Sequence, residues 1–130
     1  MGDYSVVNLK DVENQGPNFG LDPADIEFRM ARVALDCKNS GVSYLKLGPG
    51  WRMPFGHVHK QQEEIYVLVN GSARMKLDDE VIELQPWTAV RVAKDTMRGY
   101  EGGPGGAELI AIGAPNTGPG DADVEQGWWN

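Results

Sequence analysis

The sequence predicts an all-β protein with one domain, built as a sandwich or barrel of short strands. Three observations support this class. Short apolar or alternating runs recur along the chain and are separated by turn residues at regular spacing. The 130 residues include 17 glycines and 8 prolines, which suit many tight turns. No long stretch repeats its apolar residues with the period of an amphipathic helix.

The expected strands follow one another from residue 26 to residue 112. The first alternates, with Ile26, Phe28 and Met30 on one face and Glu27 and Arg29 on the other. Clusters of glycine, asparagine, aspartate and proline supply turns at 39–41, 48–50, 70–71, 78–79 and 102–106. We therefore expect strands at 26–35, 42–47, 55–59, 64–69, 72–77, 80–84, 88–92, 97–101 and 107–112.

Residues 64–71 carry the strongest local signals. Asn70-Gly71 lies between two apolar runs, and this dipeptide is typical of the turn of a β-hairpin. The strand at 64–69 is mostly apolar on both faces. A strand buried by the core on one face, and by a ligand cavity or a second subunit on the other, has this pattern.

The two ends of the chain differ from the middle in charge. The net charge is −7; residues 1–27 carry six acids and one base, and residues 114–130 carry three acids and no base. We expect an N-terminal arm at 1–25, a barrel at 26–113 and an irregular tail at 114–130. Because two tryptophans are costly to leave in water, Trp128 and Trp129 should dock on the barrel or on a partner subunit.

The charge distribution argues against nucleic acid as a partner, since no basic face or stripe is present. No apolar run approaches the roughly 20 residues that cross a membrane, and the start lacks the pattern of a signal peptide. Cys37 is the only cysteine, so no disulfide framework is expected. These features predict a cytoplasmic protein without a membrane partner.

Both histidines of the chain fall in one short segment, His57-Val-His59, and Glu64 follows five residues later. Successive side chains of a strand point to opposite faces, so His57 and His59 share a face, with Cα atoms roughly 6.5 Å apart. The connector 60–62 can turn the chain back, so that Glu64 faces the same cavity. Two imidazoles and a carboxylate suit a divalent transition metal such as Fe, Mn, Ni or Zn.

This spacing resembles the first motif of the cupin superfamily: His-x-His, three or four residues, Glu, six residues, Gly. The chain has His57-Val-His59, four residues, Glu64, six residues and Gly71. The resemblance covers about residues 26 to 113 and implies a single-domain cupin, a jelly-roll-like double-stranded β-barrel. It also implies a homodimer, because cupins of this size are commonly dimers.

The second cupin motif, which supplies a third histidine ligand, is altered. Ala93, Asp95, Arg98 and Gly102 stand where the motif has proline, glycine, histidine and asparagine. Three roles remain open for Arg98. It could hold a substrate carboxylate beside a three-ligand metal site, it could pair with Glu64 in a metal-free pocket, or it could only bridge strands at the barrel mouth.

Two tyrosines share strand faces with these polar residues, Tyr66 with Glu64 and Tyr100 with Arg98. We expect Arg98, Tyr66 and Tyr100 to line a pocket for a small organic molecule that carries a negative charge. Three functions follow as hypotheses. The first is a metal-dependent enzyme of the oxygenase or isomerase type. The second is a non-catalytic barrel that binds or senses a small ligand at a degenerate, metal-free site, and the third is an interaction module.

Overall fold

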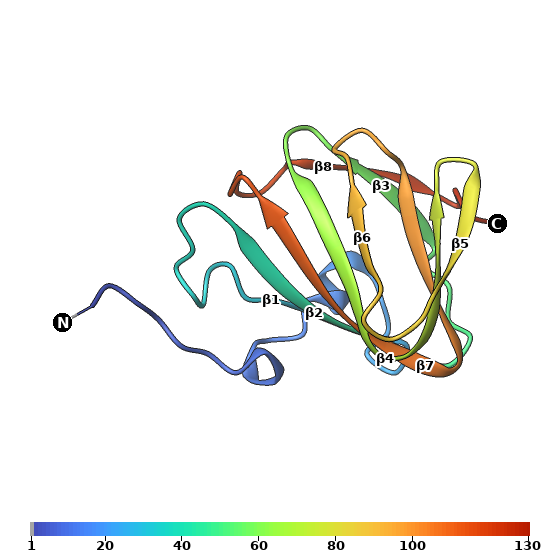
Figure 1. The fold of residues 1–130 in the computed structure, drawn as a ribbon, viewed down its shortest axis with the longest axis horizontal. Coiled ribbons are helices and arrows are strands. Elements are labelled where there is room, and N and C mark those ends of the chain that lie inside the picture. Colours follow the sequence, from blue (N-terminus) through green and yellow to red (C-terminus); the bar gives the residue numbers. More distant parts are fainter. Residues whose placement is uncertain (1) are drawn as a thin grey trace.

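Strands make up nearly all of the regular secondary structure in this computed structural model, which describes residues 2–130 (Figure 1). The prediction of an all-β protein is confirmed. In chain order the elements are the 3-10 helices η1 (Leu9–Asp11) and η2 (Gly16–Phe19), then β1 (Ile26–Met30), β2 (Gly41–Leu47), β3 (Phe55–His59), β4 (Glu63–Leu77), β5 (Glu80–Leu84), β6 (Ala89–Val92), β7 (Arg98–Ala114) and β8 (Ala122–Gln126). No helix among these residues is long and apolar enough to span a membrane.

Two long antiparallel strands, β4 and β7, organise the sheet. Their pairing runs from Glu63 opposite Ala114 to Leu77 opposite Arg98, with register shifts near Asn70. The first part of β4 and the last part of β7 form one leaf with β1, β2 and β6. The other parts of both strands form a second leaf with β3, β5 and β8. The result is a double sheet, and β4 and β7 cross from one leaf to the other.

The expected hairpin at Asn70-Gly71 is wrong, and so is the expected turn at 102–106. Both segments lie inside long strands, so the strands predicted at 64–69 and 72–77 are one, as are those at 97–101 and 107–112. Gly71 and Gly106 have φ angles of 82° and 81°. A Cβ on Gly71 would overlap the carbonyl oxygen of Gly106. The glycines therefore permit a shared bend in two paired strands, where the sequence suggested chain reversals.

The strand expected at 26–35 is also partly wrong, because β1 ends at Met30. The Ala31 N–H still donates to the Val42 carbonyl, but the Leu35 N–H donates back to the Ala31 carbonyl at 2.8 Å. The chain therefore leaves the sheet in a helical turn after Ala31. Ala31 is still fully buried, but Val33 is 80% exposed, so this turn carries an apolar side chain outside the core.

The tail expected to be irregular contains β8, which pairs antiparallel with β3 along its whole length. All five residues of β8 are exposed. An exposed edge strand leaves no alternating apolar pattern, which is why the sequence did not reveal it. Beyond β8, Trp129 is only 7% exposed, and Trp128 lies against Gly56 and Gly99. The prediction that the two tryptophans dock on the barrel is confirmed.

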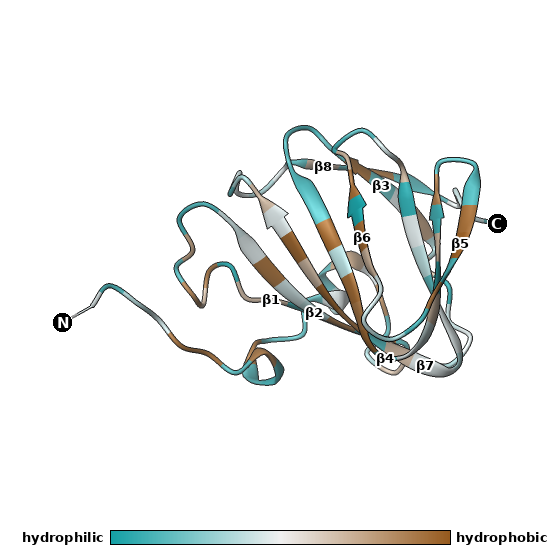
Figure 2. Cartoon of the chain, in the orientation of Figure 1, coloured by the Kyte–Doolittle hydropathy of each residue, from teal (hydrophilic) through white to brown (hydrophobic). Residues whose placement is uncertain are grey.

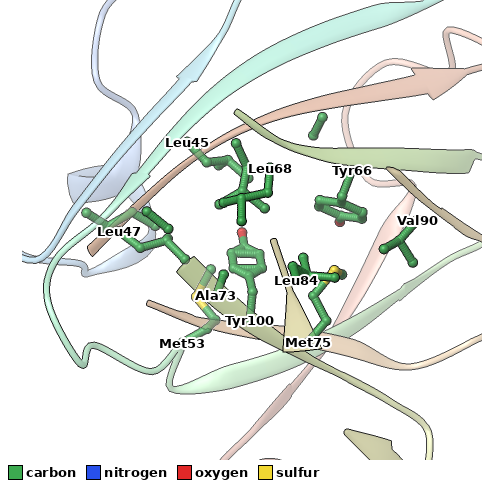
Figure 3. Close-up of a cluster of buried hydrophobic side chains, with 14 of the residues drawn as sticks. Leu45, Leu47, Met53, Tyr66, Leu68, Ala73, Met75, Leu84, Val90 and Tyr100 are labelled. Atoms are coloured by element: carbon green, nitrogen blue, oxygen red, sulfur yellow. The ribbon is translucent and has the colours of Figure 1, made fainter. Parts of the chain in front are cut away.

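An apolar cluster fills the space between the two leaves. Figure 3 shows Tyr66 and Leu68 from β4 and Tyr100 from β7 pointing into this cluster, together with side chains from β2 and β5. In Figure 2 hydrophobic residues form short bands along β2, β4 and β7, which alternate with polar positions. The alternation places one face of each strand in the interior, and this interior adjoins the polar cluster described below.

The bend gives the first prediction. Replacing Gly71 with alanine should lower the free energy of unfolding by about 2–4 kcal/mol, because it combines a strained positive φ with overlap against β7. Urea unfolding of the purified variant measures this. Gly105→Ala is the matched control, since nothing lies within 4 Å of a Cβ at that position. Equal stability of the two variants would contradict the role assigned to the bend.

Candidate metal centre

Strand β3 presents His57 and His59 on one face, as its period of two requires. Their ring centroids are 5.0 Å apart and the rings are nearly perpendicular. Both Nε2 atoms approach the same oxygen of Glu64, Oε1, at 3.5 Å from His57 and 3.1 Å from His59. The structure therefore brings together the three residues that the sequence singled out as metal ligands.

Glu64 lies near the start of β4 and is the centre of the polar cluster. The Tyr66 hydroxyl donates to Oε1 at 2.6 Å, and the Arg98 guanidinium donates to the same oxygen at 2.7 Å. Within the part of the chain that the structure describes, the hydrogen bonds and ion pairs of this carboxylate all involve Oε1. The second oxygen, Oε2, is thus the one left for a further ligand.

Arg98 begins β7 directly opposite His57 and is fully buried. Besides its bond to Glu64, it donates to the carbonyl oxygens of Thr96 at 3.1 Å and Ala93 at 2.7 Å. Of the three roles left open by the sequence, pairing with Glu64 is the contact that the structure contains. The same side chain also ties the loop before β7 to β4, because its donors reach both.

The electrostatics of the cluster follow from burial and mutual contact. Burial alone would raise the pKa of Glu64, but His57, His59 and Tyr66 hold it well below its usual range. Burial lowers the pKa of His57 despite the nearby carboxylate, so this ring is neutral at pH 7. For His59 burial acts in the same direction, but Glu64 and Asp121 outweigh it and raise the pKa.

Asp121 is a member of the cluster that the sequence analysis missed. Its Oδ2 lies 2.9 Å from Nδ1 of His59, and the side chain is 6% exposed. A carboxylate only accepts, so Nδ1 carries the hydrogen and Nε2 of the neutral ring is left with its lone pair. No local signal could identify Asp121, because it lies 62 residues after His59 in an acidic tail.

The remaining polar atoms show that the site suits a metal ion. His59 Nε2 is buried and has no hydrogen-bond partner among the described residues, although Glu64 Oε1 is close to it. Two acceptor atoms at this distance repel unless a proton or a metal ion lies between them. One ligand atom each from His57, His59 and Glu64 lies within 4.8 Å of the others. Two imidazoles and a carboxylate are a donor set for Fe, Mn, Ni or Zn, so the residues fit the ion.

Tyr66 and Tyr100 lie side by side on the inner face, with ring centroids 6.0 Å apart and 2% of each residue exposed. Tyr66 joins the cluster through Glu64, whereas Tyr100 packs in the apolar cluster (Figure 3). Burial raises the pKa of both hydroxyls, and Glu64 raises it further. Two surface hollows lie elsewhere, one beside Glu101 and the other beside Lys46, and no residue of the polar cluster lines either.

The sequence matches no protein-family model and no curated protein. Solved structures do resemble the chain. A cupin protein from Bacteroides fragilis is 24% identical with a TM-score of 0.71, over 92% of this chain and 91% of that one. KdgF from a Halomonas species is 18% identical with a TM-score of 0.64, over 90% and 89%. Pac13 from Streptomyces, described as a nucleoside dehydratase, is 14% identical with a TM-score of 0.71, over 97% and 92%.

Identities this low establish the fold and nothing finer. The two-leaf antiparallel sheet and these structural neighbours agree in architecture. The resemblance found in the sequence is confirmed at the level of architecture. The chain has the fold of the cupin proteins, a small cupin-like barrel.

The cluster gives the second prediction. Glu64→Gln should lower the free energy of unfolding by about 3–5 kcal/mol in the presence of a chelator, because it leaves the buried charge of Arg98 without its carboxylate. The neighbouring variant Glu63→Gln is the control. Glu63 pairs with Arg91 on the surface, so its loss should cost less than about 1 kcal/mol. Chemical unfolding at pH 7 separates the two cases.

The same pair predicts a pH dependence. The folded-state pKa of Glu64 is lowered, so its stabilisation is present above its ordinary pKa near 4.5 and is lost as the pH falls below that value. The stability difference between wild type and Glu64→Gln should therefore shrink as the pH falls from about 5 to about 3. A difference that stays constant over this range would show that Glu64 is not held as a carboxylate by its neighbours.

Proposed function

We propose that this chain binds one divalent transition-metal ion through His57, His59 and Glu64 and acts on a small organic molecule beside it. The observation that carries the proposal is the buried Nε2 of His59, which faces Glu64 and His57 without a hydrogen-bond partner among the described residues. Asp121 holds the other ring nitrogen. This arrangement is typical of a metal-ligating histidine.

A bound ion would supply Lewis-acid or redox chemistry at positions that the protein leaves open. An oxygenase-like or isomerase-like reaction fits such a centre. Among the structural neighbours, Pac13 is described as a nucleoside dehydratase, so at least one barrel of similar architecture is an enzyme. The fold alone does not choose a reaction, which is why the proposal depends on the side chains of the cluster.

Arg98, Tyr66 and Tyr100 are the residues we propose for contact with the small molecule. Arg98 brings a buried positive charge to the cluster, and a planar guanidinium binds carboxylates well. A substrate with an anionic group could replace Glu64 as its partner. Tyr66 and Tyr100 would line the same inner face, one polar through its contact with Glu64 and the other packed beside it.

A second candidate function has its own support. The direct bond from Arg98 to Glu64 and the bond from Tyr66 to the same oxygen complete a network without any ion. The raised pKa of His59 would allow a proton on Nε2 to satisfy Glu64 instead of a metal. In that case the chain would be a non-catalytic barrel that binds or senses a small ligand.

Metal content distinguishes the two functions and gives the third prediction. Elemental analysis of protein purified without a histidine tag should find near one ion per chain, or chelator-treated protein should take up one equivalent of added Fe(II), Mn(II), Ni(II) or Zn(II). His57→Ala and His59→Ala should each abolish this uptake, because each removes one of three ligands. Glu63→Gln should bind as the wild type does. A folded wild type that takes up none of these ions would favour the metal-free function.

We also propose a homodimer, formed through the outer face of the leaf that contains β2, β4 and β7. The strand register places five apolar residues together on this face: Val42, Ile65, Val67, Ile110 and Ile112. Of these, Ile112 is 39% exposed. Charged pairs of both signs border the face, Glu63 with Arg91 at one end and Glu27 with Lys46 at the other. A second copy related by a two-fold axis could match acid against base around an apolar centre.

The N-terminal arm adds support, because it extends away from the barrel (Figure 1) and its residues Tyr4 and Val6 are 80% and 86% exposed. The fourth prediction is that sedimentation velocity at micromolar concentration shows a dimer, which Ile112→Glu converts to a monomer. Val81→Glu is the control, since Val81 is 46% exposed but lies on β5 in the other leaf. A monomeric wild type, or a dimer unaffected by Ile112→Glu, would reject this interface.

A further inference from the structure

We propose that the C-terminal strap, residues 121–129, is a working part of the metal site: Asp121 positions His59, and Trp128 and Trp129 hold the strap in place. The inference rests on the proposed metal site. It assigns a role to a segment that lies outside the sequence motif and about 60 residues beyond the two histidines.

Asp121 is fixed on both of its oxygens. Oδ2 accepts from the His59 ring at 2.9 Å and from the Gln62 N–H at 3.2 Å, while Oδ1 accepts from the Gln61 N–H at 3.0 Å. Its own carbonyl accepts from the Lys60 N–H at 2.9 Å. The carboxylate therefore has one orientation, and it imposes one tautomer and one ring position on His59.

Strand β8 extends this attachment along all of β3, the strand that contains the two histidine ligands. Ala122 pairs with His59 and Val124 pairs with His57, so both ligand positions of β3 have the strap as their neighbour. Because β8 is an edge strand with every side chain exposed, little apolar burial holds it in the middle. Its attachment therefore depends on backbone pairing and on its two ends.

At the far end of the strap, two tryptophans pack over Gly56 and Gly99, which have no side chains. The guanidinium carbon of Arg52 lies 4.4 Å from the centroid of Trp129, and Nζ of Lys76 lies 4.4 Å from that of Trp128. Arg52 also donates to the Trp129 carbonyl. A Cβ on Gly56, the residue before His57, would overlap the Trp128 ring. Trp128 thus packs against the strand that carries the ligands, and Trp129 packs next to it against Arg52.

Docking of the strap and loading of the ion are consequently linked. If the docked strap orients His59 for the metal, the bound metal must stabilise the docked strap by the same free energy. The strap should exchange its backbone amides more slowly with the ion present. Variants at either end of the strap should weaken ion binding, including variants that touch no ligand.

The fifth prediction uses Zn²⁺ as the probe, with titration calorimetry on the full chain. Asp121→Asn should raise the Kd about 10–100-fold, because it removes the charged partner of a ligating histidine. Asp123→Asn should leave the Kd unchanged, since Asp123 is exposed and its nearest cation is Lys60 at 3.9 Å. Trp129→Ala should also raise the Kd, whereas Trp87→Ala, which alters a tryptophan that is 75% exposed, should not.

Hydrogen exchange is a second measurement. If Asp121 only stabilised the fold, the effect of Zn²⁺ on amide exchange in the strap would not depend on it. In the wild type, Zn²⁺ should slow the exchange of residues 122–126, and this effect should disappear in Asp121→Asn. Circular dichroism of the ion-free variants reports whether they fold. If Asp121→Asn does not fold, the wild-type exchange and the two tryptophan variants still decide the question.

The outcomes separate the strap from the site it serves. If the wild type and Asp121→Asn bind Zn²⁺ with equal affinity, the proposed role of the strap is wrong and the metal site is unaffected. The same holds if the amides of the strap exchange at the same rate with and without Zn²⁺. A folded wild type that binds no Zn²⁺, Fe(II), Mn(II) or Ni(II) overturns both proposals. The proposed role of the strap is supported if Zn²⁺ slows exchange in the wild-type strap and if the Kd for Zn²⁺ rises in Asp121→Asn and Trp129→Ala but in neither control variant.

Discussion

The shared bend of β4 and β7 is the constraint on which the rest of the structure depends. The two strands pair at both ends and are interrupted at residues 103–106 of β7, where they pass from one leaf of the double sheet to the other beside Gly71 and Gly106. This crossing allows Arg98, in the second leaf, to reach Glu64, in the first. Without the bend these residues would stand at opposite ends of one flat ribbon, and the barrel would have no interior.

The interior explains why the polar residues are arranged as they are. A buried guanidinium and a buried carboxylate are each costly alone, so each must find a partner within the barrel. Arg98 finds Glu64 and two backbone carbonyls, and His59 finds Asp121. The groups stabilise one another and so fix the orientation of both histidines. The geometry that suits a metal is in this sense a consequence of satisfying buried polar atoms.

Glu64 is the residue at which the two candidate functions diverge. Its Oε1 already accepts hydrogen bonds from Arg98 and Tyr66, while Oε2 and the Nε2 lone pair of His59 remain for an ion. If an ion binds, Arg98 stands beside it as a cation that an anionic substrate could neutralise. If none binds, the bonds from Arg98 and Tyr66 to Glu64 close the network without a metal. The strap bears on this choice, because it sets the tautomer of His59.

Features that depend only on neighbouring residues could be predicted from the sequence. Alternation indicated the strands, and the period of two placed His57 and His59 on one face, because neighbouring residues of a strand have no freedom to do otherwise. Glycine-rich segments were ambiguous, since a positive φ serves a hairpin turn and a strand bend equally well. Three features became visible only in the folded chain: β4 and β7 continue through the glycines, a polar edge strand follows at 122–126, and Asp121 holds His59. Each of these depends on contacts between distant parts of the chain, which leave no mark on local sequence.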